Sequence, residues 1–375
     1  MAGLYIHVPF CTKRCLYCDF FSNTDMGYKA PYLQALTKEM ALRASYLRGE
    51  PIETIYFGGG TPSQLAADDF KPIFEAIHRH FGVASDAEIT LEANPDDLTP
   101  TYIYSLRSLP FNRLSMGIQS FHDDDLRLLN RRHTASQAIE AVDRCQQAGL
   151  TNLSIDLIYG LPRQTAEAWE DNVAKALALQ VPHLSAYHLT YEEGTALYRL
   201  MEQGSVKPID EELSLRLFEI LMDRLAEAGY AHYEISNFAK PGYYARHNSS
   251  YWTGKSYLGL GPSAHSYNGE ERSWNAASLP IYIKGIAEGH PALEKEELDL
   301  PTRYNDYVIT RLRTEWGISL DELASQFGKR WQAYCLRQAR PAMERKWLEQ
   351  KEGTLRLTRE GIFVSDGIMS DLLWV

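Results

Sequence analysis

Three of the five cysteines in this 375-residue chain lie together near its start, in the segment LYIHVPFCTKRCLYCDFF. Cys11, Cys15 and Cys18 have the spacing C-x3-C-x2-C. Thiolates are the usual ligands of iron–sulfur clusters, and a 4Fe-4S cluster takes one ligand on each iron. Three local thiolates hold three irons and leave the fourth open to a small chelating ligand. The spacing therefore predicts a reactive 4Fe-4S site.

Other uses of three neighbouring cysteines fit the sequence less well. A structural zinc site needs four ligands, and the nearby His7 lies inside an apolar run that reads as a strand. A disulfide would leave an odd cysteine, in a chain without the secreted context that favours disulfides. Three inert buried thiols are the remaining alternative. We expect Cys145 and Cys335, which lie in helical patterns, to be small core residues.

The cysteine segment resembles the radical S-adenosylmethionine superfamily, with an aromatic residue, Tyr17, just before the third cysteine. The preceding YIHVPF narrows the resemblance to the subfamily of the oxygen-independent coproporphyrinogen III oxidases, which this chain resembles over most of its length. Those oxidases carry a further cysteine two residues after the third, where this chain has Phe20. The C-x-F variant is typical of relatives described as HemW-type heme chaperones. Phe20 therefore argues against oxidase activity.

Composition narrows the class of partner. The net charge is −11 and we find no long basic run, so a nucleic-acid partner is disfavoured, because phosphate binding needs clustered Lys and Arg. No apolar stretch approaches the roughly 20 residues of a membrane span. The chain starts directly with a strand pattern, so we expect no signal or transit peptide. Together with free thiols, this indicates a cytoplasmic location.

The first half of the chain alternates strand and helix patterns. Six βα units predict a parallel sheet, either an open partial barrel or a doubly wound fold, because a full barrel has eight strands. In both folds ligands bind at the carboxyl ends of the strands. The resemblance implies an α/β fold of the partial (β/α)6 barrel type. We expect the strands at Leu4–Val8, Ile55–Phe57, Glu88–Glu92, Arg113–Met116, Ser154–Ile158 and Leu184–Leu189.

After residue 193 the alternation changes. We expect residues 1–193 to form the core, 194–295 an extension of the barrel and 296–375 a small C-terminal domain, with the linker within Gly289–Pro301. In the extension, Tyr233–Phe238 reads as one strand and Tyr243–Asn268 as a functional loop region. The order helix–helix–helix–strand beyond about residue 300 indicates a helical, winged-helix-like domain. It also resembles the C-terminal domain of the coproporphyrinogen oxidase relatives.

Glycines directly follow the second expected strand, at Gly58-Gly59-Gly60. Without a Cβ, they let a charged ligand approach backbone N–H groups closely. A tight turn explains the same glycines, so the signal alone is weak. The resemblance implies that this segment receives the amino group of S-adenosylmethionine.

Further residues match family positions that contact S-adenosylmethionine, and most follow an expected strand. Their chemistry suits the ligand: Arg131 can pair with its carboxylate, Glu92 can accept from its ammonium group, and Asp156 can accept from ribose hydroxyls. Whether one or two molecules bind stays open. The resemblance implies contacts at Tyr5, Tyr17, Gly59, Gly60, Thr61, Glu92, Gln119, Arg131, Asp156 and Thr190.

A second constellation, RHNSSYW at Arg246–Trp252, resembles the HNxxYW segment of the HemW-type relatives. A histidine can be an axial ligand of heme iron, and aromatic side chains can pack on the porphyrin. A histidine hydrogen-bonded within a loop is the plain alternative. The resemblance implies heme contact at His247, and His265 in GLGPSAHS is a weaker candidate.

These features favour a heme chaperone that carries a 4Fe-4S cluster, S-adenosylmethionine and heme, and that delivers heme to an acceptor protein, which can be membrane-associated. One alternative is the oxidase, which abstracts hydrogen from propionate side chains with a 5′-deoxyadenosyl radical. Another is a radical enzyme acting on a different tetrapyrrole, such as a methyltransferase of heme breakdown. The fourth reading is a cluster protein that catalyses no reaction, and the residues expected to bind S-adenosylmethionine argue against it.

Overall fold

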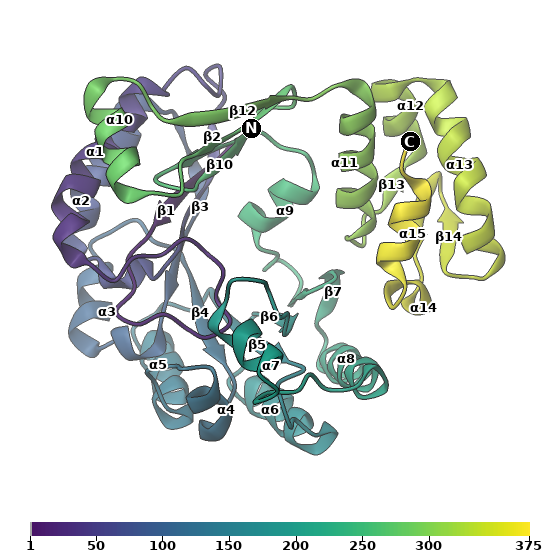
Figure 1. Ribbon diagram of the computed structural model, residues 1–375, viewed down its shortest axis with the longest axis horizontal. Helices are drawn as coiled ribbons and strands as arrows, with labels where there is room; N and C mark the ends of the chain where they lie inside the picture. The colour runs from purple at the N-terminus through teal and green to yellow at the C-terminus, as the bar shows by residue number, and fades with distance from the viewer. Residues whose placement is uncertain (1) are drawn as a thin grey trace.

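The structure is a computed structural model that describes residues 2–375. A twelve-stranded sheet with helices on one side makes up most of it, and a small domain follows (Figure 1). Six neighbouring parallel strands form the centre of the sheet, which confirms the predicted α/β class. They are β1 (Ala2–Val8), β2 (Ile52–Gly59), β3 (Val83–Ala93), β4 (Arg113–Gln119), β5 (Leu153–Tyr159) and β6 (His183–His188).

The helices between these strands cover one face of the sheet (Figure 1). Three short 3-10 turns accompany them, at Met26–Tyr28, Pro62–Gln64 and Pro95–Asp97. The helices are α1 (Lys29–Leu42), α2 (Ala67–His80), α3 (Pro100–Leu106), α4 (Asp123–Leu128), α5 (Ala135–Gln147) and α6 (Ala166–Ala178).

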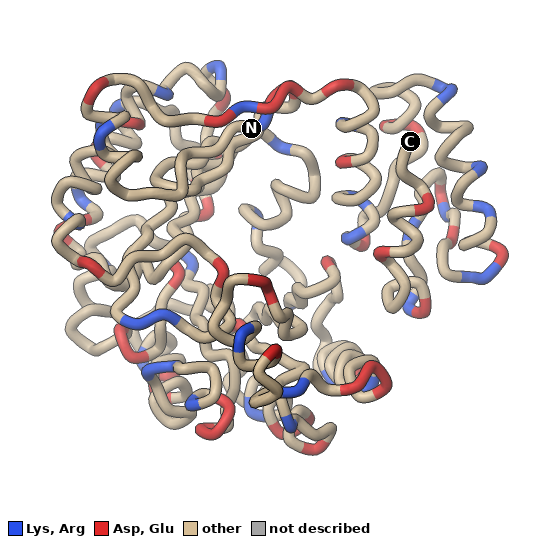
Figure 2. Tube along the Cα trace, viewed as in Figure 1, with Lys and Arg blue, Asp and Glu red and all other residues tan. Residues whose placement is uncertain are grey.

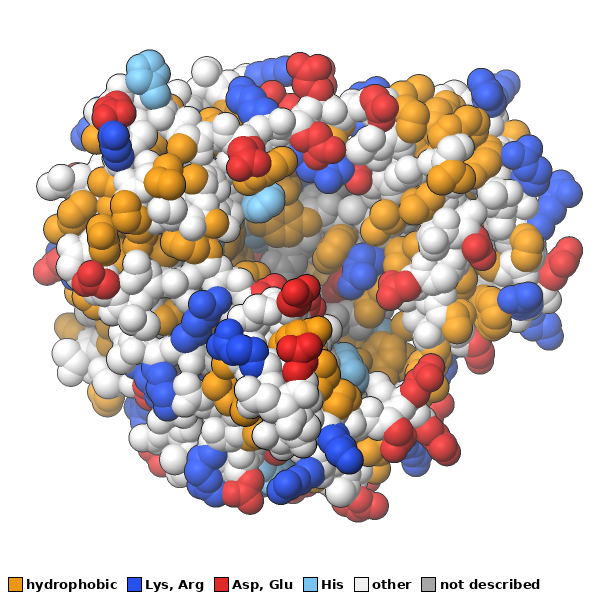
Figure 3. All heavy atoms as spheres, in the orientation of Figure 1, with side chains coloured by type: hydrophobic (Ala, Val, Ile, Leu, Met, Phe, Trp, Pro, Cys, Tyr) orange, Lys and Arg blue, Asp and Glu red, His pale blue; other side chains and the backbone are white. Residues whose placement is uncertain are grey.

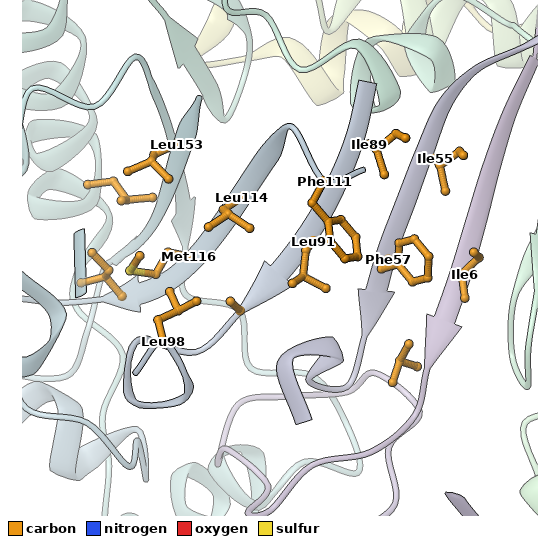
Figure 4. Packing of buried hydrophobic residues seen from close by; sticks show 14 of the residues in the cluster. Ile6, Ile55, Phe57, Ile89, Leu91, Leu98, Phe111, Leu114, Met116 and Leu153 are labelled. Carbon is orange, nitrogen blue, oxygen red and sulfur yellow. The ribbon is translucent and has the colours of Figure 1, made fainter. Parts of the chain in front are cut away.

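Alternate side chains of the central strands form the core beneath these helices (Figure 4). Ile55 and Phe57 of β2, and Leu114 and Met116 of β4, are all buried in this cluster. Because successive strand residues point to opposite faces, the residues between them lie on the other side of the sheet, which we call the inner face. The inner face is polar. It carries Tyr5, Thr54, Tyr56, Glu88, Thr90, Glu92, Arg113, Ser115, Gln119, Ser154, Asp156, His183 and Ser185.

Both ends of the sheet are extended by later segments. After α7 (Ala196–Glu202) and α8 (Glu211–Glu227), strands β7 (Ala231–Glu234) and β8 (Asn237–Ala239) pair antiparallel beside β6. At the other end β9 (Tyr257–Leu260) lies parallel to β1. Antiparallel strands β10 (His265–Tyr267), β11 (Glu271–Asn275) and β12 (Leu293–Glu297) complete this end.

Two expectations, for Tyr233–Phe238 and for Tyr243–Asn268, are wrong in detail. The single strand at Tyr233–Phe238 is two strands, because the Glu234 carboxylate accepts hydrogen bonds from Ser236 N and Asn237 Nδ2 and fixes a turn. The loop at Tyr243–Asn268 contains α9 (Arg246–Trp252), β9 and β10. The linker segment after α10 (Leu279–Glu288) contains β12, which carries charges of both signs (Figure 2).

The C-terminal domain has its own hydrophobic cluster, which runs from Tyr304 to Leu372. Its strands form a separate sheet in the order β13-β15-β14, so the domain has two strands more than the pattern predicts. No helix in residues 2–375 is long and apolar enough to cross a bilayer. The elements are α11 (Leu300–Leu312), β13 (Ile318–Ser319), α12 (Leu320–Phe327), α13 (Lys329–Glu344), β14 (Leu348–Lys351), β15 (Thr354–Leu357), α14 (Arg359–Ile362) and α15 (Ser365–Leu372).

Candidate cofactor site

The cysteine loop follows β1 and lies at the carboxyl end of the sheet. The Cys11 Sγ atom is 3.3 Å from Thr61 Oγ1, and Arg131 donates to Cys15 Sγ at 3.3 Å. Burial raises the pKa of the Cys11 thiol, and raises that of Cys18 to about 11. Cys15 adds to both shifts through its charge, so the three sulfurs share one site.

This donor set fits a polynuclear cluster. Buried thiols of raised pKa are neutral without a metal, and bound iron is the cation that would hold them as thiolates. Arg131 and Thr61 add donors to two of the sulfurs, as is usual around cluster sulfurs. Within residues 2–375 no three His, Cys, Asp or Glu side chains, the three loop cysteines included, are gathered closely enough to hold a metal ion.

The glycines after β2 are required by close packing. Gly59 has φ +107°, and a Cβ there would lie 2.6 Å from the His7 ring. A Cβ on Gly60 would lie 2.8 Å from the carbonyl carbon of Pro9. Because Gly60 meets backbone atoms, no side-chain rotation can relieve that contact.

Two backbone N–H groups of this turn form hydrogen bonds within the protein. Gly60 N donates to Val8 O, and Thr61 N donates to Phe10 O, each at 2.8 Å. These bonds attach the turn to the strand end and loop that carry the cysteines. The turn therefore positions the cysteine loop.

Glu92 lies beside this turn on the inner face. The Tyr56 hydroxyl donates to Glu92 Oε1 at 2.7 Å, and the Gly59 N–H is a second donor to the carboxylate. Burial raises the pKa of Glu92 to about 7, and the charge of Asp156 adds to the shift. Tyr5 stacks on Tyr56 with ring centroids 6.2 Å apart. Sequence reasoning missed Tyr56, although its alternation with Gly58 places it on this face.

Asp156 is the second inner-face carboxylate. Ser115 Oγ lies 3.4 Å from Asp156 Oδ1, and Ser185 is a further hydrogen-bonding partner. Burial raises the pKa of Asp156 to about 6. Two carboxylates that are costly to ionise alone favour a cationic ligand nearby, since its charge offsets their desolvation.

Gln119 and Arg131 meet where β4 ends. Gln119 has φ +71°, and the β4–β5 register shifts between Gly117 and Gln119. Arg131 donates to Asn94 Oδ1 at 2.7 Å and to Gly117 O at 2.5 Å, besides its bond to Cys15. Left-handed backbone at a non-glycine residue costs about 1–3 kcal/mol and clusters at functional sites.

The remaining predicted residues lie around this centre. Tyr17 packs against a small hydrophobic cluster with Leu129 and Leu197; burial raises the pKa of its hydroxyl and the Arg131 charge lowers it. Thr190 is exposed just after β6. Phe20, at the position of the oxidases' fourth cysteine, is 63% exposed.

His247 lies beneath the site, on α9. Its imidazole is 1% exposed, with Nδ1 2.8 Å from Thr54 Oγ1 and Nε2 2.8 Å from the Tyr251 hydroxyl. The ring stacks on Tyr56 at 5.0 Å. Burial lowers the pKa of His247 to about 3. Both ring nitrogens are thus engaged within the protein.

Comparisons with known proteins place the chain in a family. The model of the radical SAM superfamily matches residues 5–176, and that of the HemN C-terminal domain matches residues 298–364. The chain is 34% identical to the heme chaperone HemW of Bacillus subtilis (strain 168), covering 100% of this chain and 99% of that protein. It is 31% identical to the mitochondrial radical S-adenosyl methionine domain-containing protein 1 of Bos taurus, covering 99% and 87%.

A solved structure shares the fold over the whole chain. Coproporphyrinogen III oxidase (HemN) from Escherichia coli superposes with a TM-score of 0.85 at 24% identity, covering 99% of this chain and 89% of that one. The chain therefore belongs to the radical SAM superfamily and, within it, to the HemW family of heme chaperones.

Proposed function

We propose that this protein carries heme, together with a 4Fe-4S cluster on Cys11, Cys15 and Cys18 and S-adenosylmethionine, and that it delivers the heme to an acceptor protein. The observation that carries this proposal is the full-length similarity to proteins named heme chaperones, at 34% identity over 100% of this chain. That span includes the cysteine loop, α9 and the C-terminal domain.

The arrangement of charges supports binding of S-adenosylmethionine. Arg131, beside Cys15, offers a guanidinium for its carboxylate, and Glu92 offers a carboxylate for its ammonium group. Asp156 on β5 can accept from the ribose hydroxyls. Cys11, Cys15 and Cys18 would hold the cluster, which would supply an electron to S-adenosylmethionine, while Arg131, Glu92 and Asp156 would orient that ligand.

The same site for S-adenosylmethionine is also compatible with one alternative function, a radical enzyme that acts on a tetrapyrrole. Coproporphyrinogen III oxidase is an enzyme of that kind. Against the oxidase stands Phe20, an exposed aromatic side chain that cannot replace a thiolate.

The test is an anaerobic assay on cluster-reconstituted protein. One arm titrates ferric hemin and follows its transfer to the apo form of a b-type heme protein. The other supplies reductant, S-adenosylmethionine and coproporphyrinogen III, and reads the tetrapyrroles by mass spectrometry. We expect hemin binding, transfer and no decarboxylation. Loss of carboxyl groups from the substrate would establish the oxidase and overturn the proposal.

The cluster assignment has its own test. Cys18→Ser should abolish the visible iron–sulfur absorption after reconstitution, because one iron loses its ligand. Cys145→Ala, which changes a buried thiol on α5 outside the loop, is the matched control and should retain it. Absorption that survived in Cys18→Ser would mean that the ligand set is wrong.

A further inference from the structure

A histidine that binds heme iron needs a free ring nitrogen and room for the porphyrin. His247 has neither in this structure. It is 1% exposed, and Thr54 and Tyr251 occupy its two nitrogens. To ligate iron it would have to leave both partners and its stack on Tyr56.

His265 on β10 meets both requirements. Its side chain is exposed, and no group in residues 2–375 hydrogen-bonds to its ring. Partial burial lowers the pKa of His265, and the Arg272 guanidinium lowers it further. The imidazole is therefore neutral near pH 7, which is the form that binds a metal.

The side chains around His265 form an aromatic surface, which we call the β10 aromatic wall (His265, Tyr267, Trp274 and Tyr257). His265 stacks on Trp274, directly opposite on β11, with centroids 5.7 Å apart and planes at 21°. Tyr267 lies two residues on, hence on the same face, with its ring 6.2 Å from that of Tyr257. Such rings offer a flat macrocycle stacking and edge contacts.

The β10 aromatic wall adjoins the cofactor site on the inner face. Tyr257 pairs with Gly3 of β1, two residues from Tyr5. His7, whose Nδ1 is 3.1 Å from the Tyr5 hydroxyl, has a pKa that burial lowers and that a protonated His265 would lower further, so the two rings lie near each other. Figure 3 shows a hollow between the sheet and the C-terminal domain, with hydrophobic and histidine side chains beside it.

Charged side chains lie on the same face. Arg272 lies opposite Tyr267, is bonded to Asp306 of α11, and is 3.9 Å from Glu296. Glu294 lies opposite Trp274. Because Asp306 and Glu296 already neutralise Arg272, a propionate would have to displace one of these carboxylates to pair with it, and Glu294 repels a propionate from the other end of the wall.

We infer that His265 is the axial ligand of the heme iron and that the porphyrin lies along the β10 aromatic wall. This inference rests on the proposed heme-carrying function and names the ligand for it. A single protein ligand on an exposed face would leave the heme accessible to the acceptor protein. That arrangement suits a protein that must release its heme.

The test titrates ferric hemin into the full-length protein and follows the Soret band and the electron paramagnetic resonance of the iron. The variants are His265→Ala, His247→Asn and, as a matched exposed histidine on outer helix α2, His78→Ala. We expect His265→Ala to lose the histidine-ligated spectrum and to bind hemin about tenfold more weakly or worse. Added imidazole should restore the spectrum, while His78→Ala and His247→Asn keep it.

Each outcome bears on the inference. An unchanged spectrum and affinity in His265→Ala, with wild-type protein binding hemin, overturns this assignment and leaves the proposed function standing. Loss in His247→Asn alone, with unchanged thermal stability, moves the iron to α9 and also overturns it. Wild-type protein that does not bind hemin removes the proposed function and the inference together. Because His265 is exposed, its substitution should change the free energy of unfolding by less than about 0.5 kcal/mol, so the variant stays folded during the titration.

Discussion

Two inner-face carboxyl groups, Glu92 and Asp156, have pKa values of about 7 and about 6 because they are buried. Tyr56 and Gly59 donate to Glu92, yet these bonds offset only part of the desolvation. The fold thus keeps a carboxylate at a position where ionisation is costly. A cationic ligand bound beside these carboxyl groups would stabilise their ionised form, because its charge offsets the cost of their burial.

Glu92→Gln should stabilise the cluster-free protein at high pH and weaken S-adenosylmethionine binding. The folded pKa of about 7 exceeds the ordinary 4.5, so the native state binds more protons between these values and the free energy of unfolding falls as pH rises through them. The variant lacks this loss and should gain on the order of 3 kcal/mol above pH 7. Urea denaturation at several pH values measures it.

The difference between Glu92→Gln and wild type should vanish below about pH 4.5, where both side chains are neutral. A gain of equal size at every pH would mean that a packing change, and not ionisation, is responsible. Equilibrium dialysis of S-adenosylmethionine with reconstituted protein supplies the second readout, and unaltered affinity would exclude Glu92 as its ammonium partner.

At the scale of elements, the join between β1 and β2 positions the cysteines. The N–H groups of Gly60 and Thr61 bond to the carbonyls of Val8 and Phe10. A short helix, α9, is attached to β3 because the Glu88 carboxylate accepts the N–H groups of Arg246 and His247, and its His247 ring stacks on Tyr56 of β2, which bonds to Glu92. The glycine turn and α9 are thus parts of one support for the site.

Gly60→Ala should destabilise this join. Its Cβ would lie 2.8–2.9 Å from backbone atoms of Val8, Pro9 and Phe10, so the chain must shift, at a cost of about 1–3 kcal/mol. The midpoint of urea unfolding and the iron retained after reconstitution should both fall. Gly82→Ala is the matched control, because nothing lies within 4 Å of its Cβ. Equal stability of the two variants would show that the turn tolerates a side chain.

For the whole molecule, several contacts join the sheet and the C-terminal domain, among them Phe218 with Phe363 and Arg359 with Asp223, and one group of them lies at the end of α11. Arg313, at the end of α11, donates to the buried carboxylate of Glu234 at 3.2 Å and lies over the Trp252 ring of α9 at 5.1 Å. The Tyr244 hydroxyl donates to Glu315 at 2.7 Å. The domain is therefore attached to β7 and to the helix that carries His247.

Arg313→Ala should loosen this attachment. It removes a charged donor from buried Glu234 and uncovers Trp252, which should lower the free energy of unfolding by about 1.5–3 kcal/mol. Limited proteolysis should release the C-terminal domain earlier than in wild type. Arg216→Ala, which removes an exposed pair with Glu219 on α8, should change stability by less than about 1 kcal/mol. Protection unchanged in Arg313→Ala would mean that other contacts hold the domain.

The sequence by itself determined the cysteine motif, the six parallel strands and the position of Glu92 and Asp156 on one face of the sheet. These follow from local rules, since spacing sets a ligand group and alternation sets the two faces of a strand. The prediction of a loop at Tyr243–Asn268 was wrong, because it relied on the Gly, Ser, Tyr and His content of that segment. Long-range pairing with β1 makes strand β9 there, and sequence pattern does not report such pairing.

Only the tertiary structure decided which side chains meet. Tyr56 joins Glu92 across two strands, and Arg131 reaches Cys15 from a loop 116 residues away in the chain. The tertiary structure buries His247 with both ring nitrogens hydrogen-bonded, and it leaves His265 exposed. In the sequence, each is simply a histidine within a segment that resembles the family. Burial and hydrogen bonding depend on neighbours distant in the chain, so a motif identifies a histidine but not its role.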